Sequence, residues 1–369
     1  MLASTLLSTL SGLALGIACC LSSGWGTVMA KEDRASSHLT AQDLSYLVAL
    51  TPRQGLAITG DDSFLAPMLV ERTPGTENHR LVQEHIVEVL HDLGWDLNLR
   101  THEEKTPLGR KPFTNIIASP RPAKPGERRV IFAAHYDSKY FEEGTFLGAT
   151  DSAVSCAVLL DTATALTPFL QDPSVVDPEA PLLQLIFFDG EEAFKEWTRQ
   201  DSLYGSRKLA EEWEQEGVLK DIDILVLLDL LGFRNQHIPN LQPGTHHQYN
   251  QLRVLANRLS SMGHLVALGE DGSLDEVPYF TTDTNGWRLG MDDDHRPFLE
   301  RGVPCLHAIT YPFPTFWHTL GDDASVIDEP TSWDTALIFR AFAASLSGLG
   351  DDRLSRAVEA SKKPEHDEL

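Results

Sequence analysis

The chain has 369 residues, of which 42% are apolar, so it is long enough to bury a large core. Its 54 acidic residues outnumber its 30 basic ones and give a formal net charge of −24. We therefore expect neither nucleic acid nor an anionic membrane surface as a partner, because both attract proteins through basic side chains.

The N-terminal segment has the pattern of a targeting sequence. Residues 1–30 contain no charged side chain, and the stretch from Leu6 to Leu21 is mostly apolar. With the small residues Val28 and Ala30 ahead of Lys31, this pattern predicts a secretory signal peptide over residues 1–30. The apolar run is short for a membrane span, so we expect no membrane insertion after cleavage, with a retained anchor as the alternative.

The segments that follow predict helices alternating with strands. Apolar residues at spacings of three and four indicate amphipathic helices in "LTAQDLSYLVAL" and, more clearly, over Thr76 to Trp95. Strand-like segments, several too continuously apolar to have a solvent-facing side, are "NIIAS", "RRVIFAAHYD", "LLQLIFFD", "DILVLLDLLG" and "VPCLHAIT". Further helices are expected at Asp151–Leu166, Ser202–Gln215, Tyr249–Met262 and Trp333–Leu346. The alternation predicts an α/β fold, a three-layer sandwich with helices on both faces of a mostly parallel sheet.

The domain organisation follows from the absence of repeats and internal linkers. Residues 31–350 are expected to form a single domain, and residues 351–369 a polar tail. The last four residues, His366 to Leu369, match the address that returns proteins to the endoplasmic reticulum. Together with the signal peptide, they predict the lumen of the endoplasmic reticulum as the location and the retention-signal receptor as a partner. Whether Cys156 and Cys305 form a disulfide cannot be decided from the sequence.

Titratable side chains gather where the predicted strands end. His135 and Asp137 follow one strand, Glu191 and Glu192 follow the next, and Asp229 follows a third. In open α/β sheets, ligands bind beyond the carboxyl ends of the strands. Each residue taken singly could be satisfying loop amides. Agreement among three strands favours a metal or catalytic site.

Two further residues could complete a metal site. Asp151 begins a predicted helix, where it could act as an N-cap, as a ligand or as both. His318 directly follows two aromatic residues in "FPTFWHTLGDD", which could orient the imidazole and exclude water. A catalytic zinc ion keeps three protein ligands and one open position, and it accepts Asp, Glu and His. Asp151, Glu192 and His318 would supply these ligands and leave Glu191 free to move protons.

Seven motifs in chain order carry a resemblance to a known family. They are "AAHYDSKYF", "FLGATDSAV", "LIFFDGEEAF", "QDSLYGSRKLA", "LLDLLG", "DDHRPFLERGVPCLH" and "FPTFWHT". From about Thr40 to Leu346 the chain resembles the animal-type glutaminyl-peptide cyclotransferases, also called glutaminyl cyclases. The resemblance implies a zinc-aminopeptidase-like fold with a mixed, mostly parallel sheet, and it makes residues 31–350 a zinc-dependent catalytic domain.

The resemblance also implies a role for each matching residue. The ligands of one zinc ion per chain would be Asp151, Glu192 and His318. The general base and acid would be Glu191, and the carboxylates of a hydrogen-bond network beside the reacting amide would be Asp229 and Asp293. The residues of the substrate pocket would be Trp197, Trp317, Phe313, His307 and Asp292.

The chain departs from the secreted animal members at one cross-link. Those members carry a cysteine where this chain has Ala134, and that cysteine bridges to the position of Cys156. The bridge cannot form here. This departure concerns a stabilising cross-link and leaves the ligand set intact.

The implied reaction converts the N-terminal glutamine of peptides and secretory proteins to pyroglutamate. The free α-amine attacks the amide carbon of its own side chain, a lactam closes, and ammonia leaves. Zinc would act as a Lewis acid on the carbonyl oxygen, and Glu191 would carry the proton from the amine to the leaving nitrogen.

Two other interpretations stay open. In a two-zinc aminopeptidase, the metals bridged by Asp151 would be held by His135, Asp151, Glu192, Asp229 and His318. A metal-bearing binding module of the lumen would not need Glu191. Trp197 and the run from Asp292 to His295 favour the cyclase, because neither has an evident duty in peptide hydrolysis.

Overall fold

The computed structural model describes residues 38–267, 277–281, 283 and 285–362. The predicted signal peptide at residues 1–30 and the predicted retention signal at residues 366–369 lie outside these residues.

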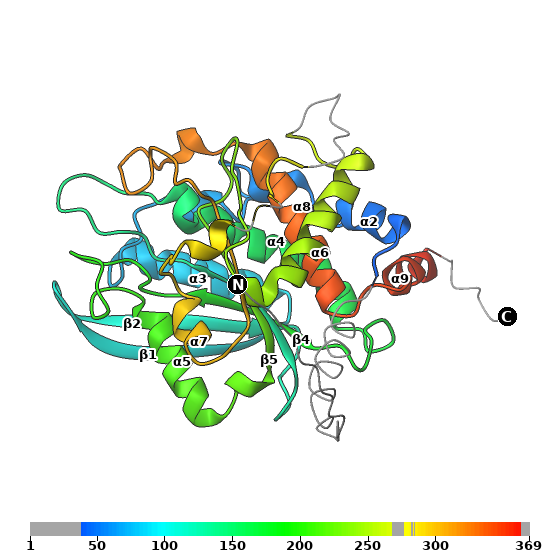
Figure 1. Cartoon of the computed structure of the whole chain (residues 1–369), viewed down its shortest axis with the longest axis horizontal. Coiled ribbons are helices and arrows are strands. Elements are labelled where there is room, and N and C mark those ends of the chain that lie inside the picture. The colour runs from blue at the N-terminus through cyan, green and yellow to red at the C-terminus, as the bar shows by residue number, and fades with distance from the viewer. Residues whose placement is uncertain (1–37, 268–276, 282, 284, 363–369) are drawn as a thin grey trace, which may run out of the picture. The chain divides into compact units, whose positions relative to one another are not determined.

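A six-stranded mixed sheet forms the centre of the described domain (Figure 1). Its strand order is β1-β2-β4-β3-β5-β6. The parallel part comprises β3 (Arg129–His135), β4 (Leu182–Phe188), β5 (Ile222–Asp229) and β6 (Cys305–Ile309). At one edge, β1 (Asp96–Thr106) and β2 (Gly109–Ser119) are antiparallel. The predicted mixed, mostly parallel sheet is confirmed.

Helices cover both faces of this sheet, as predicted. One face packs against α3 (Glu77–Asp92), α4 (Val154–Leu170) and α8 (Glu329–Leu346), with α6 (His246–Ser261) beside α8. The opposite face packs against α5 (Tyr204–Glu216) and α7 (Arg296–Leu299). Successive strand residues point to opposite faces, so Phe132 enters the first core and its neighbours Ile131 and Ala133 enter the second.

Short helical turns connect these elements. They are η1 (Arg53–Leu56), η2 (Ala66–Met68), η3 (Ala149–Ala153), η4 (Leu219–Asp221), η5 (Pro243–Thr245), η6 (Asn285–Arg288) and η7 (Ala324–Val326). The first and last described helices are α2 (Ala41–Val48) and α9 (Arg353–Ser361). Cys156 and Cys305 are both buried and unbridged.

Helix α4 is the central helix of the larger core. The stretch Ala149–Leu170 is apolar and long enough to cross a membrane by composition, but 89% of its apolar window is buried in the domain, which is typical of a core helix. A buried ion pair joins α4 to α8, with Arg340 Nε 3.1 Å from Asp161 Oδ2. Because an unpaired buried charge costs about 3–5 kcal/mol, this pair fixes the two helices against each other.

Strand β1 and helices α7 and α9 are absent from the sequence prediction. Strand β1 is absent from the predicted strands because its segment, "DLNLRTHEEKT", is a mainly polar edge strand that is largely exposed. Part of the predicted polar tail is helical: Arg353–Ser361 form α9, in which Leu354 is buried. The Ser355 amide of α9 donates to Asp43 Oδ1 of α2 at 2.9 Å, which docks the helix on the domain.

Candidate active site

A cavity of ≈ 620 Å³ lies at the carboxyl ends of the parallel strands. Nine of the eleven residues that the sequence assigns to the site line it, namely Asp151, Glu191, Trp197, Asp229, Asp292, Asp293, Phe313, Trp317 and His318. The other two lie directly behind this lining: Glu192 contacts His318, and His307 contacts Asp293. The structure therefore brings all eleven residues together.

Asp151, Glu192 and His318 fit a metal ion. His318 Nε2 lies 3.5 Å from Asp151 Oδ2 and 3.3 Å from Glu192 Oε1. Two ligand atoms on one tetrahedral zinc ion are about 3.4 Å apart, because each lies about 2.0–2.2 Å from the metal. Glu192 Oε1 is buried and has no hydrogen-bond partner among the described residues, a costly state that a metal ion would relieve.

The charges of this triad favour a cation. Burial lowers the pKa of His318, but the neighbouring carboxylates of Asp151 and Glu192 outweigh burial and raise that pKa to about 10. The two carboxylates therefore attract a proton or a metal ion to the same place. Trp317 stacks on the His318 ring with centroids 4.0 Å apart, so the aromatic neighbour orients the imidazole as predicted.

Asp151 does not cap the helix that it precedes. Its backbone is non-helical, with φ −116° and ψ 76°, and no side chain caps α4. Its two carboxylate oxygens instead face different neighbours, Oδ1 at 3.0 Å from His135 Nε2 and Oδ2 at 3.5 Å from His318 Nε2. The N-cap interpretation is wrong, and the carboxylate is available as a ligand.

The guanidinium of Arg72 holds one side of the turn that presents Asp151. This buried group donates from Nη2 to the carbonyl oxygens of Gly148 at 2.8 Å and of Asp151 at 3.3 Å. It also donates from Nη1 to the Leu147 carbonyl and from Nε to the Tyr136 carbonyl. Arg72 therefore ties the turn to the end of β3.

The carboxylate of Asp322 holds the other side of the turn. Its Oδ1 accepts from the Thr150 amide at 2.9 Å and its Oδ2 accepts from the Asp151 amide at 3.1 Å. Burial and the charge of Asp151 raise the pKa of Asp322 to about 7. We call Arg72 and Asp322 the clamp of the Asp151 turn. Sequence reasoning missed both, because most of their partners are backbone groups, which leave no pattern in the sequence.

The ligand types of a second metal site also meet here. His135 Nε2 lies 3.0 Å from Asp151 Oδ1 and 3.5 Å from Asp229 Oδ1. Asp229 Oδ1, however, already accepts hydrogen bonds from Ser152 Oγ and from the Leu230 amide, both at 2.7 Å. A carboxylate oxygen has two lone pairs. Both lone pairs of this oxygen are therefore engaged by donors, which disfavours a metal between His135 and Asp229.

The adjacent glutamates have different surroundings because of the turn between β4 and α5. Gly190 has φ +70°, and a Cβ there would lie 2.4 Å from the Phe113 ring, so the turn requires glycine. The amides of Glu191 and Glu192 both donate to the buried Asp137, at 3.1 and 3.2 Å. Glu191 then lines the cavity, while Glu192 lies behind it against His318.

The carboxyl group of Glu191 is tuned towards holding a proton. Burial raises its pKa well above the ordinary value. The charge of His135 opposes this rise, and the charges of Glu192 and Asp293 reinforce it. A carboxyl group with a raised pKa is suited to both taking and giving a proton near neutral pH.

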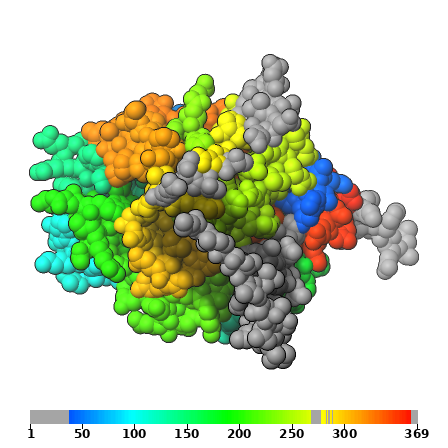
Figure 2. Space-filling model, in the orientation of Figure 1, coloured from blue at the N-terminus to red at the C-terminus, as the bar shows by residue number. Residues whose placement is uncertain are grey.

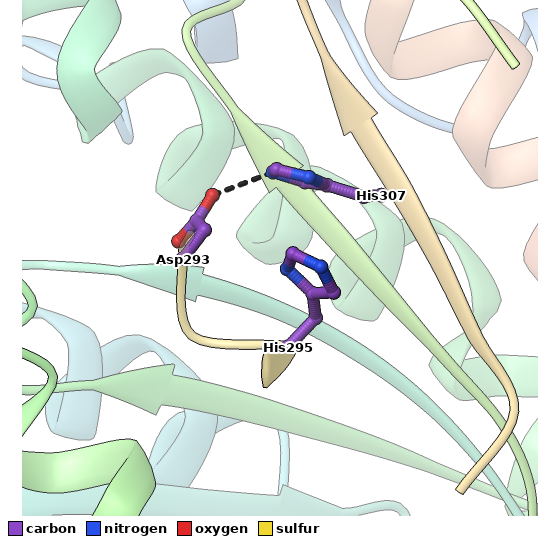
Figure 3. A group of neighbouring side chains, drawn as sticks. All are labelled: Asp293, His295 and His307. Carbon is purple, nitrogen blue, oxygen red and sulfur yellow. Dashed lines mark hydrogen bonds and ion pairs between the residues drawn. The ribbon is translucent and has the colours of Figure 1, made fainter. Parts of the chain in front are cut away.

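Asp293 belongs to a buried network with two histidines (Figure 3). His307 Nε2 donates to Asp293 Oδ2 at 2.6 Å, and the Asp294 amide donates to Asp293 Oδ1 at 2.6 Å. The His295 ring lies over the His307 ring with centroids 4.2 Å apart. The contact between Asp293 and His307 is shorter than the ~3.4 Å between two ligands of one zinc ion, so it is a hydrogen bond that orients Asp293.

Aromatic side chains form the walls of the cavity. Trp197 is 38% exposed, and its Nε1 donates to Asp292 Oδ2 at 3.2 Å. Phe313 stacks on Trp317 with centroids 4.1 Å apart. Sequence reasoning missed Lys139, which lines the cavity and lies 2.9 Å from Glu192 Oε2. Its position after the "HYD" motif was the available signal.

Known proteins resemble this chain over most of its length. Residues 115–343 match peptidase family M28. The chain is 43% identical over 278 residues to a glutaminyl-peptide cyclotransferase of Drosophila melanogaster, which covers 75% of this chain and 77% of the fly protein. It is 40% identical over 294 residues to a glutaminyl-peptide cyclotransferase of Bos taurus, covering 75% and 79%. The chain belongs to the glutaminyl-peptide cyclotransferase family.

Membership of the glutaminyl-peptide cyclotransferase family makes the chain an enzyme and sets aside the non-enzymatic interpretation. Solved structures agree with the fold. A glutaminyl cyclase from Macrostomum lignano superposes with a TM-score of 0.72 at 35% identity, covering 84% of this chain and 94% of that one. A Zn-dependent exopeptidase from Parabacteroides distasonis superposes with a TM-score of 0.57 at 19% identity, covering 82% and 96%, and so shares the fold.

The clamp predicts a specific loss of metal binding. We expect Asp322→Asn to weaken zinc binding about 10- to 100-fold, because the amide cannot accept from both backbone N–H groups that hold Asp151 in place. The matched control is Asp323→Asn, since the Asp323 side chain is partly exposed and, among the described residues, bonds to Ser325 alone. Titration against a chromophoric chelator measures both affinities. Equal zinc affinity in Asp322→Asn and the wild type would refute the clamp.

Proposed function

We propose that the chain is a zinc-dependent glutaminyl-peptide cyclotransferase that converts the N-terminal glutamine of peptides and proteins to pyroglutamate with release of ammonia. The observation that carries this proposal is one cavity in which the Asp151–Glu192–His318 triad adjoins a buried, unligated Glu191. The family relationship supports the same reaction.

Glu191 is the proton carrier in this proposal. A single zinc ion held by Asp151, Glu192 and His318 would supply Lewis acidity to the side-chain carbonyl of the substrate. Glu191 takes a proton from the substrate α-amine as the new C–N bond forms. It then gives that proton to the amide nitrogen as the old C–N bond breaks and ammonia leaves. The raised pKa of Glu191 suits both transfers.

The other cavity residues position the reacting groups. Asp293 is oriented by His307, and Asp229 by Ser152, so their carboxylates face the cavity in fixed directions. Trp197 and Trp317 confine the glutamine side chain between them. Because the amine and the amide belong to one residue, holding a single rotamer brings them together, which is the proximity term of catalysis.

The alternative of a two-zinc aminopeptidase is less well supported. It needs Asp229 as a ligand, but the oxygen that faces His135 is already bonded to Ser152 and Leu230. A one-zinc site leaves these hydrogen bonds in place. We therefore propose one zinc ion per chain.

The products of two matched peptides test the proposal. A peptide that starts with Gln should lose the mass of ammonia, keep all its residues and have a blocked N-terminus. The same peptide starting with Leu should remain unchanged, because it has no amide carbon for its amine to attack. Mass spectrometry separates the outcomes. Release of free leucine would contradict the proposal and favour the aminopeptidase.

The two glutamates should separate proton transfer from metal binding. We expect Glu191→Gln to keep its zinc and to lower kcat about 10²- to 10⁴-fold, because the proton carrier is removed. Glu192→Gln should lose zinc and activity together. Metal analysis and single-turnover rates measure the two effects. Zinc lost from Glu191→Gln but kept in Glu192→Gln would reverse the assignment.

We further propose that the enzyme acts in the lumen of the endoplasmic reticulum. The charge-free, apolar residues 1–30 and the terminal sequence at residues 366–369 support this location. Deleting residues 366–369 should move activity from the cell to the medium, because the retention receptor no longer binds. Unchanged retention would instead favour an uncleaved membrane anchor in residues 1–30.

A further inference from the structure

A second cavity of ≈ 360 Å³ adjoins the active-site cavity. Asp292 lines both cavities, and Trp197, bonded to Asp292, lies at their boundary. The second cavity lies between α5, α7 and the loop that joins β4 to α5. The surfaces of the two helices adjoin in Figure 2, α5 in green and the α7 segment in gold. Four of its lining residues are arginines: Arg199, Arg207, Arg296 and Arg301.

The acidic residues of the second cavity are already paired. Arg296 lies 3.6 Å from Asp292 and 3.0 Å from Glu300, and Lys208 lies 3.6 Å from Glu211. Two of the arginines are paired as well, Arg207 with Glu104 at 2.7 Å and Arg301 with Glu214 at 3.0 Å. Arg199 is different, because its guanidinium forms no ion pair with any described residue.

Lys195 and Arg199 are two exposed cations on either side of Trp197. Lys195 lines the active-site cavity and Arg199 lines the second cavity. Across the described part of the chain, neither side chain has an ion-pair partner. The one acidic residue between them, Glu196, lines neither cavity. In a chain of net charge −24, this is a local excess of positive charge at the mouth of the active site.

The loop that carries these cations is held in place. Buried Asp201 accepts from the amides of Phe194 and Lys195 at 2.9 Å and of Glu196 at 3.0 Å. The hydroxyl of Tyr204 also donates to Asp201, at 2.7 Å. The backbone on which Lys195 and Arg199 stand is therefore fixed relative to the cavity.

We propose that Lys195 and Arg199 bind an acidic side chain of the peptide substrate, close behind its N-terminal glutamine. The inference rests on the proposed function. The substrate amine is drawn to the carboxylates inside the cavity, and the rest of the peptide has to leave through the mouth. An extended peptide advances about 3.3–3.6 Å per residue, so the residues directly behind the glutamine are the first to reach the mouth. An acidic interior and a basic rim complement a peptide with a free amine followed by a carboxylate.

The expected effect is moderate and sensitive to salt. Each contact between exposed charges changes a binding constant by about two- to five-fold. Because the contact is remote from the reacting atoms, it forms equally in the ground state and the transition state and changes KM rather than kcat. Added salt screens it.

The test compares amidated five-residue peptides that start with Gln and carry Glu, Gln or Lys at the second, third or fourth position in turn. At low ionic strength the wild type should show a kcat/KM at least about five-fold higher for the best Glu peptide than for the matching Lys peptide. Salt at about 0.5 M should bring this ratio near one. The double variant Lys195→Gln/Arg199→Gln should give a ratio near one even at low salt.

Two controls separate this effect from general damage. The first control is the ratio of the two kcat/KM values measured with the same variant. A smaller fraction of folded or zinc-loaded enzyme lowers both values equally and leaves their ratio unchanged. Lys220→Gln removes a charge near the opposite, amino end of β5 and should keep the wild-type ratio. A wild type with no Glu preference at any position, or a double variant with an unchanged ratio, would overturn the inference. If the wild type does not cyclise even the peptide with the neutral substitution, the proposed cyclotransferase function is contradicted as well. If the wild type cyclises all the peptides equally, only the proposed binding of acidic side chains is contradicted.

Discussion

The site depends on the turn that presents Asp151. The guanidinium of Arg72 holds its carbonyl oxygens and the carboxylate of Asp322 holds its amides, so the turn is fixed through its backbone from two sides. The carboxylate of Asp151 then faces His318 with one oxygen and His135 with the other. The Asp151–Glu192–His318 triad and the contact between Asp151 and His135 therefore share one residue, which the hydrogen-bonded turn keeps in place.

The loop between β4 and α5 supplies most of the remaining chemistry. Two buried aspartates anchor it, Asp137 at the glutamate pair and Asp201 at the segment that precedes Trp197. Because the loop is anchored at both places, one short stretch of chain carries the residues that we propose for proton transfer, Glu191, for metal binding, Glu192, and for substrate contact, Trp197. The proposed specificity for acidic peptides, through Lys195 and Arg199, would come from the same loop. Substitutions at Lys195 and Arg199 should thus change substrate preference and leave Glu192 in place.

The sequence predicts the buried strands and the residues in recognisable motifs well. It predicts poorly the residues that act through hydrogen bonds to backbone groups. The continuously apolar strands that end at His135 and Asp229, and the one that precedes Glu191, are recognisable because parallel sheets bury both faces. Edge strand β1 is not recognisable, since exposure on the sheet edge allows a polar sequence. Asp151 could be read as a cap or a ligand until its dihedral angles were known. Arg72 and Asp322 leave no pattern, because residues far apart in the chain meet them through carbonyl and amide groups. Helix α9 was missed because its segment, "RLSRAVEAS", is short and contains few large apolar side chains.

We propose that one metal ion binds between Asp151, Glu192 and His318, and that Glu191 and Asp229 do not bind a metal ion. Anomalous diffraction at the zinc absorption edge, from crystals of the zinc-loaded enzyme, tests it most directly. We expect a single strong peak per chain between Asp151, Glu192 and His318. A second peak of comparable height between His135, Asp151 and Asp229 would contradict it and would identify a two-metal centre.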